Sequence, residues 1–169
     1  SNLSSSRALK DRTEMNGCKH YFSAVGEVNV VEMMKKKNAV IGGEGNGGII
    51  LPELHYGRDA LVGIALFLTY LSKQKIPCSE LRKTYPNYFM SKEKVKLEKG
   101  LDVDYVLDQI KIKYSNEQIN SEDGLKIDFQ DSWVQLRKSN TEPIVRVYSE
   151  AKSQQSADEL SSNFIKEIK

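Results

Sequence analysis

The chain has 169 residues, enough for one ordinary domain or two small ones. Hydrophobic residues make up 39% of it and charged residues 28%, values typical of a globular protein, which exclude collagen-like, coiled-coil and wholly disordered chains. The formal net charge of +2 creates no strong field toward nucleic acid or anionic lipid, so a bound anion must be held by a local site.

The cysteines and the apolar runs exclude several other classes of protein. Cys18 and Cys78 are the only cysteines and have no C-x-x-C spacing, so neither a disulfide framework nor a zinc site is predicted. The longest apolar run, residues 60–68, is well short of the roughly 20 residues that a membrane span requires. We therefore expect a cytoplasmic protein without a membrane partner.

The first half of the chain has the element order of an α/β layer. The polar start of the chain could form a short helix over residues 6–15, and apolar spacing predicts a helix over residues 28–36. A brief β-like run over residues 39–41 precedes a glycine-rich loop over residues 42–48. Residues 57–73 form the strongest predicted helix, and its broad apolar surface predicts burial on more than one side. A strand, a loop and a helix in this order are typical of an α/β layer.

The pattern changes near Pro86, and residues 86–92 are predicted to connect two domains. The elements predicted beyond this point are a strand over 94–98, a helix over 102–114, strands over 125–129, 133–138 and 144–148, and a helix from about Ser156, where Ser156 and Glu159 have capping-box spacing. This order predicts a four-stranded, mainly antiparallel sheet with two helices. We therefore expect an incomplete α/β domain over residues 1–86 and an α+β domain over residues 87–169.

The glycine-rich loop over residues 42–48 is the first candidate site. Its glycines formally match a dinucleotide-binding pattern, but an apolar run ending at Pro52 follows where a helix should begin, and Glu44 would repel phosphate. A carboxylate and an amide between glycines, here Glu44 and Asn46, can instead exchange hydrogen bonds with sugar hydroxyls. An ordinary flexible turn is the alternative.

The second candidate site is the polar loop RKSNTEP over residues 137–143, between two predicted strands. Arg137 can meet phosphate oxygens with two parallel hydrogen bonds, while Ser139 and Thr141 hydroxyls fill the remaining acceptors. Glu142 could orient a neighbouring arginine. The alternative is a polar hairpin loop with a surface arginine.

Three further residues are candidates for supporting roles. Arg146 lies beyond the second loop, within reach of Glu142. His55 and Arg58 precede the strongest predicted helix, where a lone histidine and arginine usually belong to a helix cap and its packing. A direct catalytic role for His55 is the less expected alternative.

Together the two loops resemble those of the α-D-phosphohexomutases, the group of phosphoglucomutases, phosphomannomutases and phosphoglucosamine mutases. The resemblance is carried, in order, by residues 25–28, 43–48, 55–59, 137–143 and 146–148. It covers nearly the whole chain, and two motifs in the right order make it specific.

This resemblance implies a role for each loop. The first loop would belong to domain 3 of such an enzyme and read the sugar hydroxyls through Glu44 and Asn46. The second would belong to domain 4 and hold the phosphate of the substrate. The implied phosphate ligands are Arg137, Ser139, Asn140 and Thr141.

The resemblance also implies what the chain lacks. The family's phosphoserine loop and its magnesium-binding aspartate loop do not occur in this sequence. We therefore expect the C-terminal, substrate-binding portion of a mutase that interconverts hexose 6-phosphate and hexose 1-phosphate through a phosphoserine and a bisphosphorylated sugar. Upstream domains of the same polypeptide would supply the serine and the Mg²⁺ ligands, and the isolated chain would bind no metal and be inactive. Many members have histidine where Gly48 stands, so glucose, mannose and glucosamine all remain candidate sugars.

Two other functions are compatible with the sequence. One is a non-catalytic, mutase-like binding or regulatory module. The other is a domain that binds single-stranded nucleic acid on its antiparallel sheet, with Phe129, Trp133 and Tyr148 as candidate stacking residues. Because a net charge of +2 is a weak field for a polyanion, we expect no nucleic-acid partner.

Overall fold

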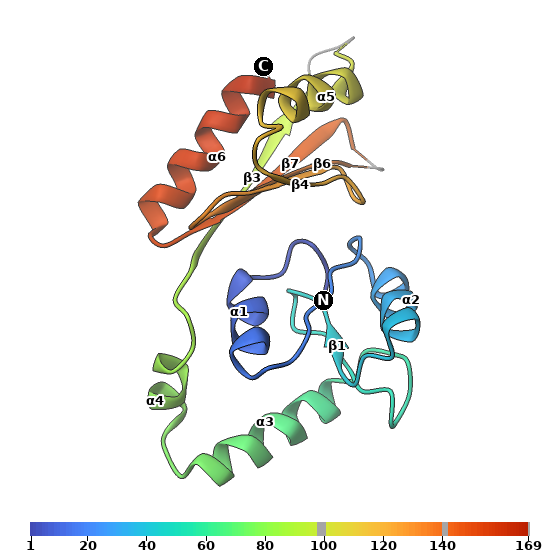
Figure 1. Ribbon diagram of the computed structural model, residues 1–169, viewed down its shortest axis with the longest axis vertical. Coiled ribbons are helices and arrows are strands. Elements are labelled where there is room, and N and C mark those ends of the chain that lie inside the picture. The colour runs from blue at the N-terminus through green and yellow to red at the C-terminus, as the bar shows by residue number, and fades with distance from the viewer. Residues whose placement is uncertain (98–100, 140–141, 169) are drawn as a thin grey trace. The chain divides into compact units, whose positions relative to one another are not determined.

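The computed structural model describes residues 1–97, 101–139 and 142–168 (Figure 1). It divides into two compact units, the N-terminal unit (Ser1–Asn87) and the C-terminal unit (Tyr88–Lys169). Over the described residues, no helix combines the length and the apolar character that crossing a membrane requires.

The N-terminal unit combines helices with a small hairpin. Its elements are α1 (Arg7–Met15), α2 (Glu27–Lys37), β1 (Gly42–Gly43), β2 (Ile49–Ile50), α3 (Ala60–Gln74) and α4 (Cys78–Lys83). β1 and β2 pair antiparallel, and Asn2 and Ser23 form an isolated parallel bridge. The predicted strand over residues 39–41 is wrong, because pairing begins only at Gly42, where the hairpin supplies a partner strand.

The core of the N-terminal unit lies between α2 and the hairpin. Val30 and Met34 of α2 are buried against Ile50 of β2. Helix α2 ends at Asn38, which adopts the left-handed conformation with φ of 50°. Gly42 packs so closely against Met34 that a side chain at position 42 would overlap the methionine sulfur. This packing fixes where the hairpin starts relative to α2.

Helix α3 is apolar but contributes no buried residue. Its first turn is capped by Asp59, whose carboxylate accepts a hydrogen bond from the N–H group of Val62 at 3.0 Å. Leu61 is 78% exposed and Leu68 is 55% exposed. The expected burial of this helix on more than one side is therefore wrong for this chain, because a hairpin with two-residue strands is too small to cover a helix of 15 residues.

The C-terminal unit is an antiparallel sheet with two helices. Its elements are β3 (Phe89–Lys96), α5 (Val103–Lys113), β4 (Gln118–Asn120), β5 (Leu125–Asp128), β6 (Trp133–Lys138), β7 (Ile144–Ala151) and α6 (Gln154–Ile168). The strand order is β3-β7-β6-β5-β4, and every neighbouring pair is antiparallel. The predicted α+β class is confirmed.

Three details of the C-terminal unit correct the prediction. The described sheet has five strands instead of four, because the three-residue strand β4 is too short for an alternating pattern to reveal it. Residues 89–92, expected in a connection, belong to β3 and pair with residues 148–151 of β7. Helix α6 begins at Gln154, and Ser153 accepts the hydrogen bond from the N–H group of Ser156 at 3.1 Å, so Ser156 is not the cap.

Both helices of the C-terminal unit cover the same face of the sheet (Figure 1). Asp102 caps α5 by accepting hydrogen bonds from the N–H groups of Asp104 and Tyr105. The buried core consists of Val95, Val103, Ile110, Leu125, Ile127, Val134, Leu136, Val145, Val147, Phe164 and Ile168. Because side chains alternate along each strand, the residues between these core positions point to the opposite face.

Candidate functional site

The glycine-rich loop is an ordered hairpin turn between β1 and β2. The N–H group of Glu44 donates to the carbonyl of Gly48 at 3.0 Å, and the N–H group of Gly47 donates to the carbonyl of Glu44 at 3.0 Å. The side chain of Asn46 accepts a hydrogen bond from the N–H group of Gly48 at 3.0 Å. Gly47 has a φ of 94°, a conformation that glycine adopts most readily. These hydrogen bonds give the loop a defined shape, unlike a freely flexible turn.

The carboxylate of Glu44 lies at the centre of this loop, with its side chain only 6% exposed. Its Oε1 accepts hydrogen bonds from Nδ2 of Asn2 at 3.1 Å and from the N–H group of Gly26 at 3.2 Å. Its Oε2 faces Nδ2 of Asn46 at 3.5 Å and a terminal nitrogen of Arg58 at 3.6 Å. Since the contacts of Oε2 are long, this oxygen keeps capacity to accept a stronger hydrogen bond from a ligand.

Arg58 is held in place by a second carboxylate, that of Glu27. The N–H group of Arg58 donates to Oε1 of Glu27 at 2.9 Å, and its Nε donates to Oε2 at 2.9 Å. The N–H group of Arg58, followed by its guanidinium, lowers the pKa of Glu27 below its ordinary value. Glu27 and Asn2 were not predicted as site residues, because 31 and 42 positions separate them from their partners and no local pattern signals such contacts.

His55 takes part in the helix cap. Its Nε2 lies 3.1 Å from Oδ2 of Asp59, the residue that caps α3. The N–H group of Val62, followed by the His55 ring, lowers the pKa of Asp59. This geometry favours the interpretation of His55 as a capping and packing residue.

The second loop joins β6 to β7, and it begins beside two arginines that face each other. Arg137 of β6 is opposite Arg146 of β7 in the strand register. Nε of Arg137 donates to Oδ1 of Asp123 at 2.9 Å, and Arg146 lies 3.5 Å from the hydroxyl of Tyr148. Asp123, which was not predicted, therefore orients Arg137 in the way suggested for Glu142.

Only part of the predicted phosphate-binding group can be described. The N–H group of Ser139 donates to the carbonyl of Ile144 at 3.0 Å, which closes the base of the loop. Asn140 and Thr141 lie outside the described residues. Lys94 of β3 is opposite Arg146 in the register, so Lys94, Arg146 and Arg137 form a row of cations across β3, β7 and β6. Like charges on neighbouring strands repel one another unless anions lie nearby. The row therefore favours binding of a negatively charged group.

The aromatic residues proposed for nucleic-acid stacking do not share an exposed sheet face. Trp133 is fully buried, and its Nε1 donates to Oε1 of Glu150 at 2.8 Å. Phe129 packs against the helix-covered core, with its ring centroid 6.0 Å from that of Tyr114. The described sheet therefore offers no stacking platform of these residues.

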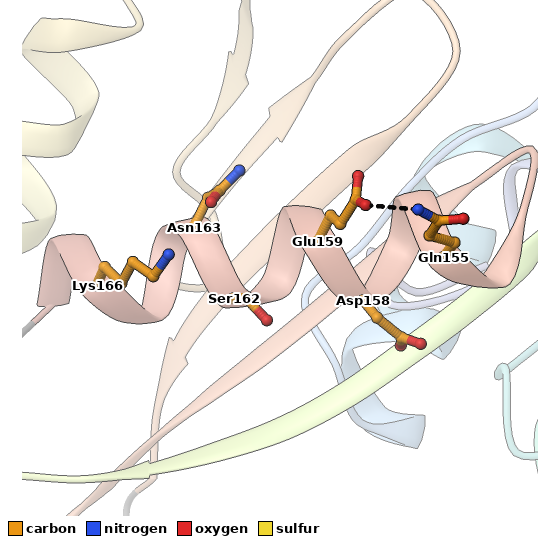
Figure 2. Close-up of a pocket in the computed structure, with 6 residues that line it drawn as sticks. All are labelled: Gln155, Asp158, Glu159, Ser162, Asn163 and Lys166. Atoms are coloured by element: carbon orange, nitrogen blue, oxygen red, sulfur yellow. Dashed lines mark hydrogen bonds between the residues drawn. The ribbon is translucent and has the colours of Figure 1, made fainter.

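A hollow lies along α6, but the side chains that line it do not converge on one point (Figure 2). Its lining consists of Gln155, Asp158, Glu159, Ser162, Asn163 and Lys166. All of them belong to one helix, and Gln155 donates to Glu159 one turn along at 2.9 Å. This surface is the polar side of an amphipathic helix, and we assign no ligand to it.

No metal site is found in the part of the chain that the structure describes. Within these residues, no group of three or more His, Cys, Asp or Glu side chains could hold a metal ion. The carboxylates near the glycine-rich loop are instead paired with Arg58 and with amide groups.

Both halves of the chain match domains of one protein family. Residues 1–88 match the α/β/α domain III of phosphoglucomutase/phosphomannomutase, and residues 91–167 match the C-terminal domain of the same family. The chain belongs to the phosphoglucomutase/phosphomannomutase family. This confirms the predicted family and the α/β class of the first half.

Members of the phosphoglucomutase/phosphomannomutase family are similar to this chain along its whole length. A phosphoglucosamine/phosphogalactosamine mutase of Sulfurisphaera tokodaii is 33% identical over 169 residues, which cover 99% of this chain and 36% of the relative. The chain thus spans about a third of the length of the curated relatives it matches.

Two solved structures share the fold. A phosphoglucomutase/phosphomannomutase family protein from Burkholderia thailandensis matches with a TM-score of 0.80 at 22% identity, covering 99% of this chain and 36% of that one. An N-acetylphosphoglucosamine mutase of Aspergillus fumigatus, in complex with GlcNAc-6P and magnesium, matches with a TM-score of 0.63 at 16% identity. The match covers 95% of this chain and 39% of that one. In this member of the family, the N-terminal unit brings Glu44, Asn46 and Arg58 together. The C-terminal unit brings Arg137 and Arg146 together.

Proposed function

We propose that this chain is the C-terminal, substrate-binding portion of a phosphohexomutase that interconverts hexose 6-phosphate and hexose 1-phosphate. The observation that carries this proposal is the match of both halves of the chain to domains of one mutase family. The geometry of the two loops then supports a separate role for each unit.

The glycine-rich hairpin of the N-terminal unit would recognise the sugar. Oε2 of Glu44 can accept a hydrogen bond from a sugar hydroxyl, because its contacts in the structure are longer than 3.4 Å and leave room for a shorter one. The exposed amide of Asn46 lies beside it and can take part in the same contacts. A buried, oriented carboxylate distinguishes hydroxyl stereochemistry better than a mobile one, since it cannot follow a misplaced partner.

The loop between β6 and β7 would hold the phosphate. Arg137 offers a planar group of donors, and Ser139, Asn140 and Thr141 would complete the ligand set, with Arg146 as supporting charge. The counter-charge of Asp123 holds Arg137 in one orientation. A cradle fixed in this way suits a substrate that binds in two orientations, because either phosphate of a bisphosphorylated sugar can occupy it.

The reacting groups would come from elsewhere in the parent enzyme. A phosphoserine would transfer its phosphoryl group to the free hydroxyl of the sugar phosphate. The resulting bisphosphorylated sugar would then reorient in the active site and return its other phosphoryl group to the serine. Mg²⁺ would stabilise the negative charge on the transferring phosphoryl group. We propose that upstream domains of the same polypeptide carry the serine and the metal ligands, since this chain spans about a third of its relatives and one solved relative contains magnesium. The residues of this chain would contribute positioning and charge.

The cysteines fit a reducing compartment. Cys18 and Cys78 are both free and exposed. We accordingly place the parent enzyme in the cytoplasm.

The test compares the whole enzyme with the isolated chain. We expect the full-length protein to turn over at least one of glucose 1-phosphate, mannose 1-phosphate and glucosamine 6-phosphate in the presence of Mg²⁺, and the isolated chain to turn over none. A full-length protein that binds hexose phosphates without turnover would support the alternative of a non-catalytic, mutase-like module. Turnover by the isolated chain that survives repeated purification would contradict the division of roles.

A further inference from the structure

The side chain of Arg58 lies directly over Gly48, at the end of the glycine-rich loop. A Cβ atom at position 48 would stand 2.5 Å from Cδ of Arg58, closer than Cβ atoms approach other atoms in proteins, and a tight 3.0 Å from its Cγ. Gly48 itself has an ordinary backbone conformation, because its φ lies outside the left-handed region. Glycine is therefore needed here for the space that its missing side chain leaves to Arg58, and not for backbone freedom.

Arg58 connects the two carboxylates of the N-terminal unit. Its Nε donates to Glu27 at 2.9 Å, while a terminal nitrogen approaches Oε2 of Glu44 at 3.6 Å. Glu27 also accepts a hydrogen bond from the main-chain N–H of Arg58, so both the backbone and the side chain of the arginine are fixed. The guanidinium is therefore oriented toward Glu44 by contacts that do not involve Glu44.

Glu44 depends on this cation. Its carboxylate is almost fully buried, and a buried charge is stable only when donors or opposite charges surround it. Oε1 is satisfied by Asn2 and Gly26, whereas Arg58 supplies the positive charge beside Oε2, the oxygen assigned to the sugar. Loss of Arg58 would remove the positive charge beside Oε2, and the carboxylate of Glu44 could then rotate toward other donors.

We propose that Arg58 is a positioning residue that orients Glu44 for sugar recognition, and that Gly48 allows it to do so by leaving space for its side chain. This inference rests on the proposed sugar-reading role of Glu44. It assigns the discrimination between sugars to a coupled pair, Arg58 and Gly48, in addition to the loop residues that would touch the substrate.

The test is a double-mutant cycle in the full-length enzyme that contains this chain. The measured quantity is the ratio of kcat/KM between the best and the poorest hexose phosphate. We expect Arg58→Ala and Gly48→Ala each to reduce this ratio by about 10-fold. Because both changes remove the same placement of Arg58, the ratio measured for the double variant should lie within about 3-fold of that for Arg58→Ala. Independent effects would instead multiply and reduce the ratio by about 100-fold.

Three further variants complete the design. Arg58→Lys keeps a positive charge without the planar group of donors, and should retain part of the discrimination that Arg58→Ala loses. Arg82→Ala removes another arginine of the same unit, which donates to Asn87 at 2.9 Å, and should leave the ratio within about 2-fold of the unmodified enzyme. Inhibition by inorganic phosphate should stay within about 2-fold in all variants, because phosphate binding is assigned to the other unit.

Glu44→Gln separates failure of this inference from failure of the proposed function. If Glu44→Gln abolishes the discrimination while folded Arg58→Ala and Gly48→Ala enzymes retain it, Arg58 does not position Glu44. Effects of Arg58→Ala and Gly48→Ala that multiply would also overturn the coupling. If Glu44→Gln itself leaves the discrimination unchanged, the sugar-reading role of the loop is wrong. Thermal unfolding of each variant shows which enzymes are folded.

Discussion

Arg137 and Arg146 lie opposite each other on neighbouring strands, a placement in which like charges repel. Asp123 compensates part of this repulsion through its contact with Arg137 at 2.9 Å. Glu142 acts electrostatically on Arg146, and Lys94 adds a third cation on the next strand, so three cations face these two carboxylates and an excess of positive charge remains in this row. At the residue scale, this excess is the feature that supports the proposed phosphate-binding role of the row.

The first prediction concerns Arg137 in the full-length enzyme. Arg137→Ala removes a charge-assisted contact, the kind worth about 1.5 to 3 kcal/mol, so it should weaken binding of every phosphosugar by about one to two orders of magnitude. The loss should be the same for glucose, mannose and glucosamine substrates, because phosphate carries no sugar stereochemistry. Inhibition constants for each sugar phosphate measure the effect.

Lys138→Ala is the matched control for this prediction. Lys138 is the next residue of β6 and pairs with Asp104 at 3.1 Å on the surface, so its removal should change binding by less than about 3-fold. Unchanged affinity in a folded Arg137→Ala enzyme would show that the row of cations does not hold the substrate's phosphate.

At the scale of elements, α3 differs from the other long helices of the chain. Its N-terminus is capped by Asp59, and its C-terminus ends at Lys75 in the left-handed conformation, so both ends are well defined. Yet α3 contributes no buried residue, whereas α6, also 15 residues long, buries Ala157, Phe164 and Ile168. The helix therefore forms from local signals, and its apolar side remains exposed in this chain.

The second prediction compares an exposed position of α3 with a core position of the same unit. Leu61→Glu should change the free energy of unfolding of this chain by less than about 0.5 kcal/mol, because Leu61 is largely exposed. Ile50→Ala should cost about 2 to 5 kcal/mol, since Ile50 is fully buried. Denaturant unfolding followed by circular dichroism gives both values.

The same pair of variants tests the exposed surface of α3. Exposed apolar side chains favour self-association, so Leu61→Glu should lower the concentration-dependent association of the chain in sedimentation experiments. A loss of stability in Leu61→Glu as large as that in Ile50→Ala would instead mean that α3 is packed against other residues.

At the scale of the whole molecule, the chain consists of two units with different degrees of completeness. The C-terminal unit has a five-stranded sheet, two helices and one continuous core in its described part. The buried hydrophobic cluster of the N-terminal unit contains only Val30, Met34 and Ile50. Since buried apolar area is the main source of stability, the two units should differ in their capacity to fold alone.

The third prediction follows from this difference. A polypeptide of residues 88–169 should fold without the N-terminal unit and unfold in one cooperative thermal transition, because its core is contributed by its own strands and helices. Dispersed amide signals in NMR spectra and coincident transitions by near- and far-UV circular dichroism would support it. A polypeptide without fixed tertiary structure would show that this core needs residues from outside the unit.

Local patterns in the sequence determined most of the secondary structure. Apolar spacing located the long helices, but the helix predicted from residue 57 begins only at Ala60, where Asp59 caps it. Alternation located β6 and the start of β7 correctly. These signals are readable because helix caps and strand alternation depend on residues only a few positions apart. The short strand β4 and the cap of α6 were missed, since each depends on a single neighbour that no repeating pattern marks.

The two motifs likewise determined the family, because each is a contiguous run of residues. Only the tertiary structure decided how Glu44 is held, since its partners Asn2, Gly26 and Arg58 come from three separate segments of the chain. The same applies to Asp123 beside Arg137 and to the space that Gly48 leaves for Arg58. Contacts of this kind arise when packing brings distant segments together, and no periodicity or spacing in the sequence records them.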